Sequence, residues 1–500
     1  MKEFNDSYSS LHNHTDYSNL RLIDSINTVK GLIDGAYDLG LTGVAITDHE
    51  TVSGHVSALN HYKKYTDGWA FMKENNIDDL TDKELEDLGF KRKFLEHIRH
   101  RDDFKLILGN EIYLTRSDLT SETHIKGEKF YHLILLAVDR IGHDQLRELS
   151  TRAWGRGYYM NMMRVPTFQE DLKEVIGFNR GHLIATTACL GGYTGQAFIN
   201  GEYEKITQFL KGMNKIMGED NFFIELQPSY QQEQIDYNSH MIINHWDEYN
   251  FTFATDSHYM DLNEQPIHKW FLQSKSGERE VDSFYSSAFL MDYSFLVSYF
   301  DKYISMPKIE DMRDNTNLIN DRVEQYSLDH EQIVPKVEYG ERYDINKIIS
   351  IQRLFKSHNQ EDYHYLNTFM NSSEDANGYL MNLILEGYYD KIHNLNTKAK
   401  KEITVAERMK ELDYELEQIY ETSIKINQSL SDYFITMAKM IQIIWNEADS
   451  LVGPGRGSAA GFLINYLIGI TQIDPMTQEL YMPPWRLTGR LHMAGYKLFE

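Results

Sequence analysis

The sequence predicts an α/β fold for its first 275 residues, followed by a more helical region. Seven short apolar runs between residues 8 and 258 alternate with stretches of helical character, which is typical of βαβ units around a parallel sheet or barrel. Six of the runs carry a His, Cys, Asp or Glu at or near the C-terminal end, where α/β barrels place their active sites. After residue 275 the pattern is less regular and richer in helix, as in residues 405–426.

The predicted strands follow one another at intervals long enough for an intervening helix. In chain order they are YSSLHNH, LTGVAITDH, KLILGNEIYL, FYHLILLAV, GHLIATTAC, NFFIELQ and FTFATDSH. Residues 62–104 are charged and helical, and we expect them to form an insertion between the second and third strands. Residues 405–426 have apolar residues at helical spacing with charges between, which predicts a surface helix packed on one face.

Length and composition narrow the possible classes of protein. A chain of 500 residues can hold two or more domains, and it has no apolar run long enough to predict a membrane span. The N-terminus lacks a secretory signal, and Cys189 is the only cysteine, which fits a reducing cytoplasm. A net charge of −25 argues against whole-surface attraction for nucleic acid. Lys398, Lys400 and Lys401 could touch DNA, although a solvated lysine run is the simpler interpretation.

Residues able to bind a metal ion recur at the ends of the predicted strands. His12 and His14 stand two residues apart, so on a strand both imidazoles face the same side, and Asp256 and His258 repeat this spacing. The remaining candidates are single residues in or near other runs: Asp24, Asp48, His49, Glu111, His132 and Cys189. Each is weak evidence alone, and His55 and His124 compete for the roles of His49 and His132. Together they predict a clustered site, whose mixed N, O and S ligands suit zinc, manganese or iron and phosphoester hydrolysis.

The order of these motifs resembles the polymerase-and-histidinol-phosphatase (PHP) domain. HNH, Asp24, TDH, GNE, His132, Cys189 and DSH occur in the family's order between residues 8 and 258. The resemblance implies a distorted seven-stranded β/α barrel with up to three metal ions. The ligand positions it implies are His12, His14, Asp24, His49, Glu111, His132, Cys189, Asp256 and His258.

The stretch GPGRGSAAG, residues 453–461, has the glycine content of a phosphate-binding loop. It is not a Walker A motif, because Arg456 precedes Gly457 and Ser458 where that motif needs Gly-Lys-Ser/Thr. The glycines allow a sharp turn, and we expect Ser458 to cap a helix formed by AAGFLINYLIGI, whose N-terminus would favour an anion. For the glycine pattern alone, a tight turn before a buried helix is the simpler interpretation.

Residues 431–475 resemble the palm domain of the bacterial C-family replicative polymerase, the DNA polymerase III α subunit. The resemblance implies that Gly457 and Ser458, with Arg456 beside them, contact the phosphates of an incoming nucleotide. It also implies three regions. These are a PHP domain at 1–275, an incomplete palm at 276–486 and an unrelated tail at 487–500.

The carboxylates that polymerisation needs are missing from this sequence. The family places a D-x-D strand shortly after the glycine loop, where its acids hold two metal ions. Asp474 and Glu479 are five residues apart and cannot form such a pair. We therefore expect an N-terminal polymerase piece, interrupted by an intron, a frameshift or a split-gene boundary. A second chain would supply the aspartates, and the completed enzyme would use Mg²⁺, a DNA primer-template and dNTP.

Two other functions remain open at this stage. The chain could be a stand-alone metal phosphoesterase, acting as a 3′–5′ exonuclease or on a small phosphate ester. Alternatively, the metals could only stabilise the fold and support partner docking, since native metal sites can contribute substantial folding free energy.

Overall fold

The computed structural model divides into two compact units, Met1–Leu328 and Asp329–Glu500, which are described separately. The structure describes residues 7–115, 130–156, 165–274, 283–331, 333–340, 343–358, 363–372, 375–394 and 403–477. Lys398, Lys400, Lys401, His124, Glu479 and the tail at 487–500 lie outside these ranges. Among the described residues, no helix combines the length and apolar character needed to cross a bilayer.

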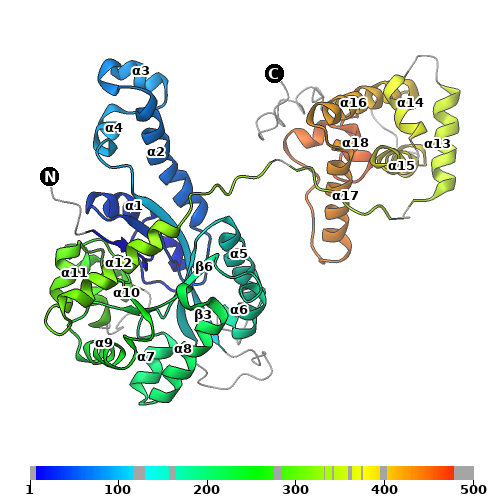
Figure 1. Ribbon diagram of the computed structural model, residues 1–500. Helices are drawn as coiled ribbons and strands as arrows, with labels where there is room; N and C mark the ends of the chain where they lie inside the picture. Colours follow the sequence, from blue (N-terminus) through cyan, green and yellow to red (C-terminus); the bar gives the residue numbers. More distant parts are fainter. Residues whose placement is uncertain are drawn as a thin grey trace. The chain divides into compact units, whose positions relative to one another are not determined.

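The first unit is built on one curled sheet surrounded by helices (Figure 1). The strand order is β1-β2-β3-β4-β6-β7-β8, with β5 paired to β3. A parallel bridge between Asn13 and Ser257 links the segments that follow the two outer strands, β1 and β8, so the sheet curls toward closure. The strands are β1 (Ser9–Ser10), β2 (Gly43–Ile46), β3 (Lys105–Thr115), β4 (Tyr131–Ala137), β5 (Pro166–Phe168), β6 (Leu183–Thr186), β7 (Phe222–Leu226) and β8 (Asn250–Phe253). All seven predicted strands are present, which confirms the barrel-like α/β fold.

Strand β4 departs from the predicted parallel arrangement. It runs antiparallel to both β3 and β6, with Leu114 opposite Tyr131 and Ala137 opposite Leu183. The other described pairs, including the short and unpredicted β5, are parallel. Antiparallel neighbours need no crossover helix between them. As a result, the start of β4 lies at the same sheet edge as the C-terminal ends of its neighbours.

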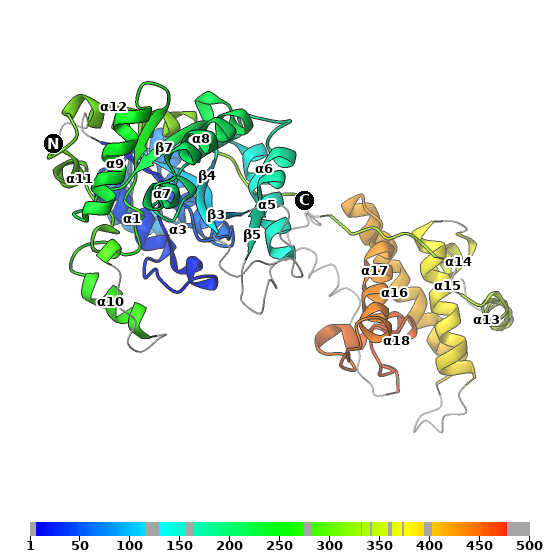
Figure 2. The ribbon, with the colours of Figure 1, turned by 90° about the horizontal axis from the view of Figure 1, so that it is seen from below.

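Helices cover the outside of this sheet (Figure 2). They are α1 (Val29–Asp38), α2 (His55–Glu74), α3 (Asp82–Asp87), α4 (Arg92–Ile98), α5 (Arg140–Gly155), α6 (Gln169–Val175), α7 (Tyr193–Ile199), α8 (Tyr203–Met217), α9 (Gln232–His245), α10 (Gln265–Ser274), α11 (Tyr293–Phe300) and α12 (Met306–Arg322). The expected insertion is the end of α2 with α3 and α4, and it stands between β2 and β3. A small apolar cluster of its own, Ile77, Leu85 and Leu95, holds α3 and α4 in place.

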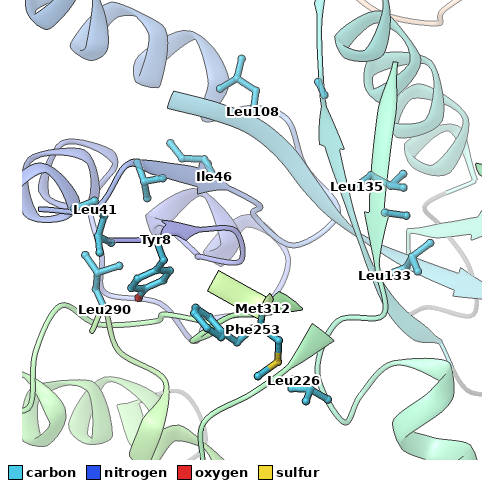
Figure 3. Close-up of a cluster of buried hydrophobic side chains, with 14 of the residues drawn as sticks. Tyr8, Leu41, Ile46, Leu108, Leu133, Leu135, Leu226, Phe253, Leu290 and Met312 are labelled. Atoms are coloured by element: carbon cyan, nitrogen blue, oxygen red, sulfur yellow. The ribbon is translucent and has the colours of Figure 1, made fainter. Parts of the chain in front are cut away.

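The apolar core of the first unit joins strands to helices that are distant in sequence (Figure 3). Ile46, Leu108 and Leu135 come from neighbouring strands, and Phe253 and Met312 reach the same cluster from β8 and α12. The hydroxyl of buried Tyr8 donates to the carbonyl of Met291 at 2.8 Å. These contacts extend the barrel unit well past residue 275.

The first compact unit extends to Leu328, past the boundary at residue 275 that was expected between the PHP domain and the palm region. Helix α12 packs on the sheet, where the Thr316 hydroxyl accepts a hydrogen bond from the Ser9 amide at 3.1 Å. The Asn317 side chain accepts a hydrogen bond from the Thr42 hydroxyl at 2.6 Å. The sequence has few prolines to mark a linker, so the irregular pattern after residue 275 hid helices that belong to the barrel.

The second unit consists of helices and loops, with no strand among its described residues. Its helices are α13 (Ile345–Ser357), α14 (His364–Asn371), α15 (Ala376–Tyr388), α16 (Val405–Ile426), α17 (Leu430–Asn446) and α18 (Leu463–Leu467). Helix α16 has the predicted bounds and buries one face, including Leu412 and Leu416, against neighbouring helices. A Thr404–Glu407 capping box fixes its start, and Asn427 in the left-handed conformation ends it.

A close approach between α5 and the segment entering β6 leads to a stability prediction. A Cβ at Gly142 would lie 1.9 Å from the carbonyl oxygen of His182, so Gly142→Ala must displace backbone. We expect a loss of about 2–3 kcal/mol in the free energy of unfolding. Gly212→Ala in α8 is the matched control, because its Cβ would meet nothing within 4 Å. This control should gain about 0.5–1 kcal/mol through helix propensity. Urea unfolding of the wild type and both variants checks the prediction. A free energy of unfolding for Gly142→Ala equal to that of the wild type would contradict it.

Candidate metal centre

The nine residues expected to bind metal are brought together at one edge of the sheet. His12 and His14 follow β1, His49 follows β2, Cys189 follows β6, and Asp256 and His258 follow β8. Glu111 lies within β3 beside His49, to which it is joined by a parallel bridge. His132 is the second residue of β4, and the reversed direction of that strand brings it to this edge. Asp24 joins them from the loop before α1.

Glu111 lies at the middle of the cluster. Its Oε2 is 3.1 Å from His14 Nε2 and 2.7 Å from His49 Nδ1. The same oxygen is 3.6 Å from His12 Nε2, and Oε1 is in contact with His132 Nδ1. A single buried carboxylate therefore faces four imidazoles, so it could contribute a ligand oxygen to ions held by these histidines.

Two further carboxylates and the thiol complete the cluster. Asp256 Oδ1 lies 3.2 Å from His12 Nε2 and 3.1 Å from His14 Nε2. Asp24 Oδ2 lies 2.9 Å from His49 Nε2 and 3.4 Å from His258 Nε2. Cys189 Sγ is 3.4 Å from His132 Nδ1. Three sets have all their ligand atoms within 4.8 Å of one another: His14, His49 and His258; His12, His14 and Asp256; and Glu111, His132 and Cys189.

Outer partners fix the orientation of three imidazoles. His12 Nδ1 is 2.7 Å from Glu225 Oε1, His14 Nδ1 is 3.0 Å from Ser18 Oγ, and His258 Nδ1 is 2.7 Å from the Asp256 carbonyl. Protonation of Nδ1 leaves the Nε2 lone pair of each ring directed at the cluster. Ligating histidines typically have an outer hydrogen bond of this kind.

Several supporting residues were not selected from the sequence as site residues. Glu225 is buried in β7, and it accepts from Thr186 as well as contacting His12. Gln227 donates to Asp256 at 3.3 Å, and the Tyr113 ring stacks on His132 at 4.6 Å. Glu225 lies near the C-terminal end of the run NFFIELQ, so its position was a usable signal. Tyr113 and Gln227 carried no such signal, because neither type is a common metal ligand.

Asp48 and His55 lie outside the metal-facing set. Asp48 accepts hydrogen bonds from Thr15 N at 2.6 Å and from Ser18 Oγ at 2.8 Å, so it organises the loop that follows His14. His55 is buried, with Nε2 2.9 Å from the Gly109 carbonyl and Nδ1 3.0 Å from His143. The choice of His49 over His55 for the cluster therefore matches the geometry.

Burial and charge act in opposite directions on the groups of the cluster. Burial alone would lower the pKa of His12, but the carboxylates of Asp256 and Glu225 raise it well above its usual range. Burial would raise the pKa of Asp24, but His49 and His258 hold it below its usual range. Burial raises the pKa of the Cys189 thiol, and the charges of Asp256 and Glu111 add to this. A metal ion would therefore displace protons from the cluster as it binds.

The donor set has the chemistry that divalent ions require. Asp24 Oδ1, Asp256 Oδ1 and both oxygens of Glu111 are buried without a conventional hydrogen-bond partner among the described residues. Imidazole nitrogens and a thiol converge on the same volume. Buried carboxylates are costly unless they are paired or coordinate a metal. The residues present therefore fit a site for one or more divalent ions.

The glycine loop lies in the second unit and differs from its predicted structure. Residues 457–461 form a short 3₁₀ turn, and α18 begins only at Leu463 after extended Phe462. Ser458 does not cap that helix, which corrects the prediction. Gly455 and Gly457 have φ of 122° and 64°, a region that favours glycine. Residues 453–457, including Arg456, are exposed to solvent.

The N-terminus of α18 is already occupied by a carboxylate from α16. Buried Glu415 accepts hydrogen bonds from Leu463 N at 2.7 Å and Ile464 N at 2.8 Å. The Asp474 carboxylate is also engaged, because Arg408 Nη2 donates to it at 2.7 Å. Any phosphate-binding capacity must therefore come from the exposed loop itself, and Asp474 serves to hold the structure.

Glu415 makes the stability of the second unit pH-dependent. Burial raises its pKa to about 8, against the opposing effect of the Ile464 and Leu463 amides. A raised folded-state pKa means that the folded form binds the proton more tightly. Its stabilising contribution is therefore present below the ordinary pKa of 4.5 and is lost as pH rises toward 8.

We expect Glu415→Gln to remove this dependence. The wild type should lose up to about 1.4 kcal/mol per pH unit relative to the variant within that window. Urea titrations at pH 5, 6.5 and 8 measure the difference. If the free energy of unfolding depends on pH in the same way in the wild type and in Glu415→Gln, Glu415 is not the source of the pH dependence.

Comparison with known proteins adds two domain matches. Residues 10–229 match the PHP domain, and residues 379–487 match the bacterial DNA polymerase III alpha NTPase domain. The chain is 37% identical over 496 residues to the DNA-directed DNA polymerase of Bacillus phage SPbeta, covering 95% of this chain and 35% of the relative. It is 27% identical over 496 residues to the DNA polymerase III subunit alpha of Aquifex aeolicus, covering 96% of this chain and 35% of that protein.

A more distant relative shows the same coverage. The DNA polymerase III subunit alpha of Borreliella burgdorferi is 24% identical over 498 residues, covering 99% of this chain and 35% of its own length. The chain thus spans about a third of the length of these polymerases. A solved structure described as a metal-dependent phosphoesterase of Bifidobacterium adolescentis covers 60% of this chain and 98% of its own at 13% identity. Its TM-score of 0.30 is too low to support an argument.

Proposed function

We propose that this chain, which carries a PHP domain followed by part of a DNA polymerase III alpha NTPase domain, supplies the N-terminal part of a replicative DNA polymerase. The observation that carries the proposal is the order of the two domain matches, within an alignment to a DNA polymerase that covers 95% of this chain. The substrates of the completed enzyme would be a DNA primer-template and dNTP. We place its action in the cytoplasm of a bacterium or of a phage-infected host.

In this proposal the exposed glycine loop contacts the nucleotide triphosphate. Gly457 and Ser458 would offer backbone amides, and Arg456 would add a charged fork. Asp474 is paired with Arg408, so carboxylates for Mg²⁺ would come from a second polymerase segment. We expect no primer extension by the 500-residue chain with Mg²⁺ and dNTP. Robust extension by the purified chain would refute the need for that segment.

We further propose that the metal centre hydrolyses phosphodiesters as a 3′–5′ exonuclease. The nine residues His12, His14, Asp24, His49, Glu111, His132, Cys189, Asp256 and His258 would hold zinc, manganese or iron. Bound divalent ions lower the pKa of water and neutralise phosphate oxygens. The chain's own part is to orient its imidazoles through Glu225 and Ser18 and to shield the centre from bulk solvent.

Exonuclease assays on a 3′-labelled oligonucleotide test this role. We expect His12→Ala and Asp256→Ala to lose metal and activity together. His61→Gln is the control, because that imidazole pairs with Asp34 on the outer helices and not with the cluster. Equal activity in the wild type and both site variants would remove the nuclease proposal.

A structural role for the metals is the second candidate, and the burial of the centre favours it. His12 and His14 are fully buried, and Asp24 and Glu111 are each 1% exposed. Of the nine residues, only His132 is partly exposed, with a side chain 24% exposed. Metals in such a site would act as cross-links between strand ends. Removal of the metal, with the stability of the first unit as the readout, separates this role from hydrolysis.

A further inference from the structure

One arginine contacts two residues that border the metal centre, Glu50 and Tyr113, without being part of the ligand set. Arg21 lies in the loop between His14 and Asp24, and its side chain is 9% exposed. Its Nε donates to Glu50 Oε2 at 2.5 Å, and its Cζ lies 5.6 Å from the centroid of the Tyr113 ring. The sequence pattern had assigned this residue no role.

The two residues that hold Arg21 are themselves tied to the cluster. Glu50 follows His49 directly, and its amide donates to the Glu111 carbonyl at 2.7 Å. The Glu50 backbone has a φ of 53°, which is unusual for a residue other than glycine. The Glu50 carbonyl accepts a hydrogen bond from Trp154 Nε1 at 2.7 Å. The Tyr113 hydroxyl is 3.3 Å from His49 Nδ1. Arg21 is therefore held in a fixed position relative to the metal-facing groups.

Only one edge of the guanidinium is used by these contacts. Nε is bound to Glu50, while Nη1 and Nη2 have no hydrogen-bond acceptor among the described residues. A guanidinium presents five N–H donors in a planar fork that matches the oxygens of a phosphate. The centre itself is lined by the carboxylates of Asp24, Glu111 and Asp256, which repel an anion until metal and arginine compensate them.

We propose that Arg21 is a substrate-binding residue of the metal centre, where its free Nη edge holds a non-bridging oxygen of a phosphodiester. The proposal rests on the proposed phosphoesterase function and names the group that recognises the phosphate. Glu50 sets the direction of the fork and limits its motion, so little conformational entropy is lost on binding. The competing explanation is a salt bridge that serves only to hold the loop between His14 and Asp24.

Arg21→Ala and Arg21→Lys in the metal-loaded full chain test the proposal. We expect unchanged metal content, a KM for a 3′-terminal oligonucleotide raised about 10- to 100-fold by Arg21→Ala, and an intermediate effect of Arg21→Lys. Arg101→Ala is the matched control, because Arg101 also combines an ion pair, with Asp103, and a ring contact, with Tyr37, away from the centre. It should leave KM unchanged.

Binding of inorganic phosphate, followed by thermal shift, gives a readout that does not need turnover. The wild type should be stabilised by phosphate, and Arg21→Ala should need about 10-fold more phosphate for the same shift. Wild-type phosphate affinity in Arg21→Ala, or loss of metal in both Arg21 variants, would overturn the proposal. If the wild type binds phosphate through Arg21 but cleaves no phosphodiester, the phosphoesterase function fails while the anion site stands.

Discussion

Replacing Glu111 with glutamine is expected to strip the first unit of its metal. Glu111 faces four imidazoles, and both of its oxygens lack a conventional hydrogen-bond partner among the described residues. The amide removes the negative charge of the carboxylate and brings a poorly ligating NH₂ group to the histidines. Loss of an outer partner alone typically costs 10- to 100-fold in metal affinity, so loss of this ligand should cost more than about 100-fold. Elemental analysis after dialysis against a weak chelator measures the effect.

A matched control is available in the same chain. Glu415 is also a buried glutamate, but it lies in the second unit and accepts two backbone amides. Glu415→Gln should retain the full metal content of the wild type. Wild-type metal content in Glu111→Gln would contradict the central position of this carboxylate. Metal loss in both variants would instead point to a general effect of unfolding.

Removal of metal from the wild-type protein should destabilise the first unit strongly. A ligand present at 1,000 times its dissociation constant stabilises the folded state by about 4 kcal/mol. For the unit Met1–Leu328, that free energy corresponds to a fall in melting temperature of roughly 6 °C. Calorimetry before and after treatment with a strong chelator measures the change. Glu111→Gln should already melt at the lower temperature and should not respond to the chelator.

The second unit provides an internal reference for this experiment. None of the metal-facing residues comes from it, so its unfolding transition should not move on chelation. Glu415→Gln identifies that transition, because it changes only the second unit. If the chelator removes the metal without shifting the unfolding transition of the first unit, the ions do not stabilise the fold. Hydrolysis would then be the role to pursue.

The metal cluster was predictable because its signal is local. Two H-x-H or D-x-H spacings and single acids or thiols at strand ends can be read from short stretches, and the structure brings all nine residues together. His132 differs from the others, because it stands near the start of its run and not at the end. It reaches the cluster because β4 is antiparallel, and strand direction depends on pairing partners that a single run does not reveal.

Features that depend on distant partners were not predicted. Ser458 was expected to cap a helix, but Glu415, more than 40 residues earlier in the chain, lies at that helix start instead. The boundary after Leu328 depends on α12 packing against β1 and β8, which no local pattern shows. Tyr113 and Gln227 support the cluster through side chains whose types carry no metal signature.

The antiparallel direction of β4 also determines where the length of the chain can change without altering the strand pairing of the barrel. Leu114 and Tyr131 are register partners at the rim that carries Glu111 and His132, so the connection between β3 and β4 leaves from and returns to the mouth of the centre. In an all-parallel barrel, a crossover would carry the chain to the opposite rim and back. Here the two ends of the connection, Thr115 and Tyr131, lie at the same rim, so the length of the connection can change while every strand keeps its register. Related proteins should therefore differ in length at this connection more than in the register of β3 and β4.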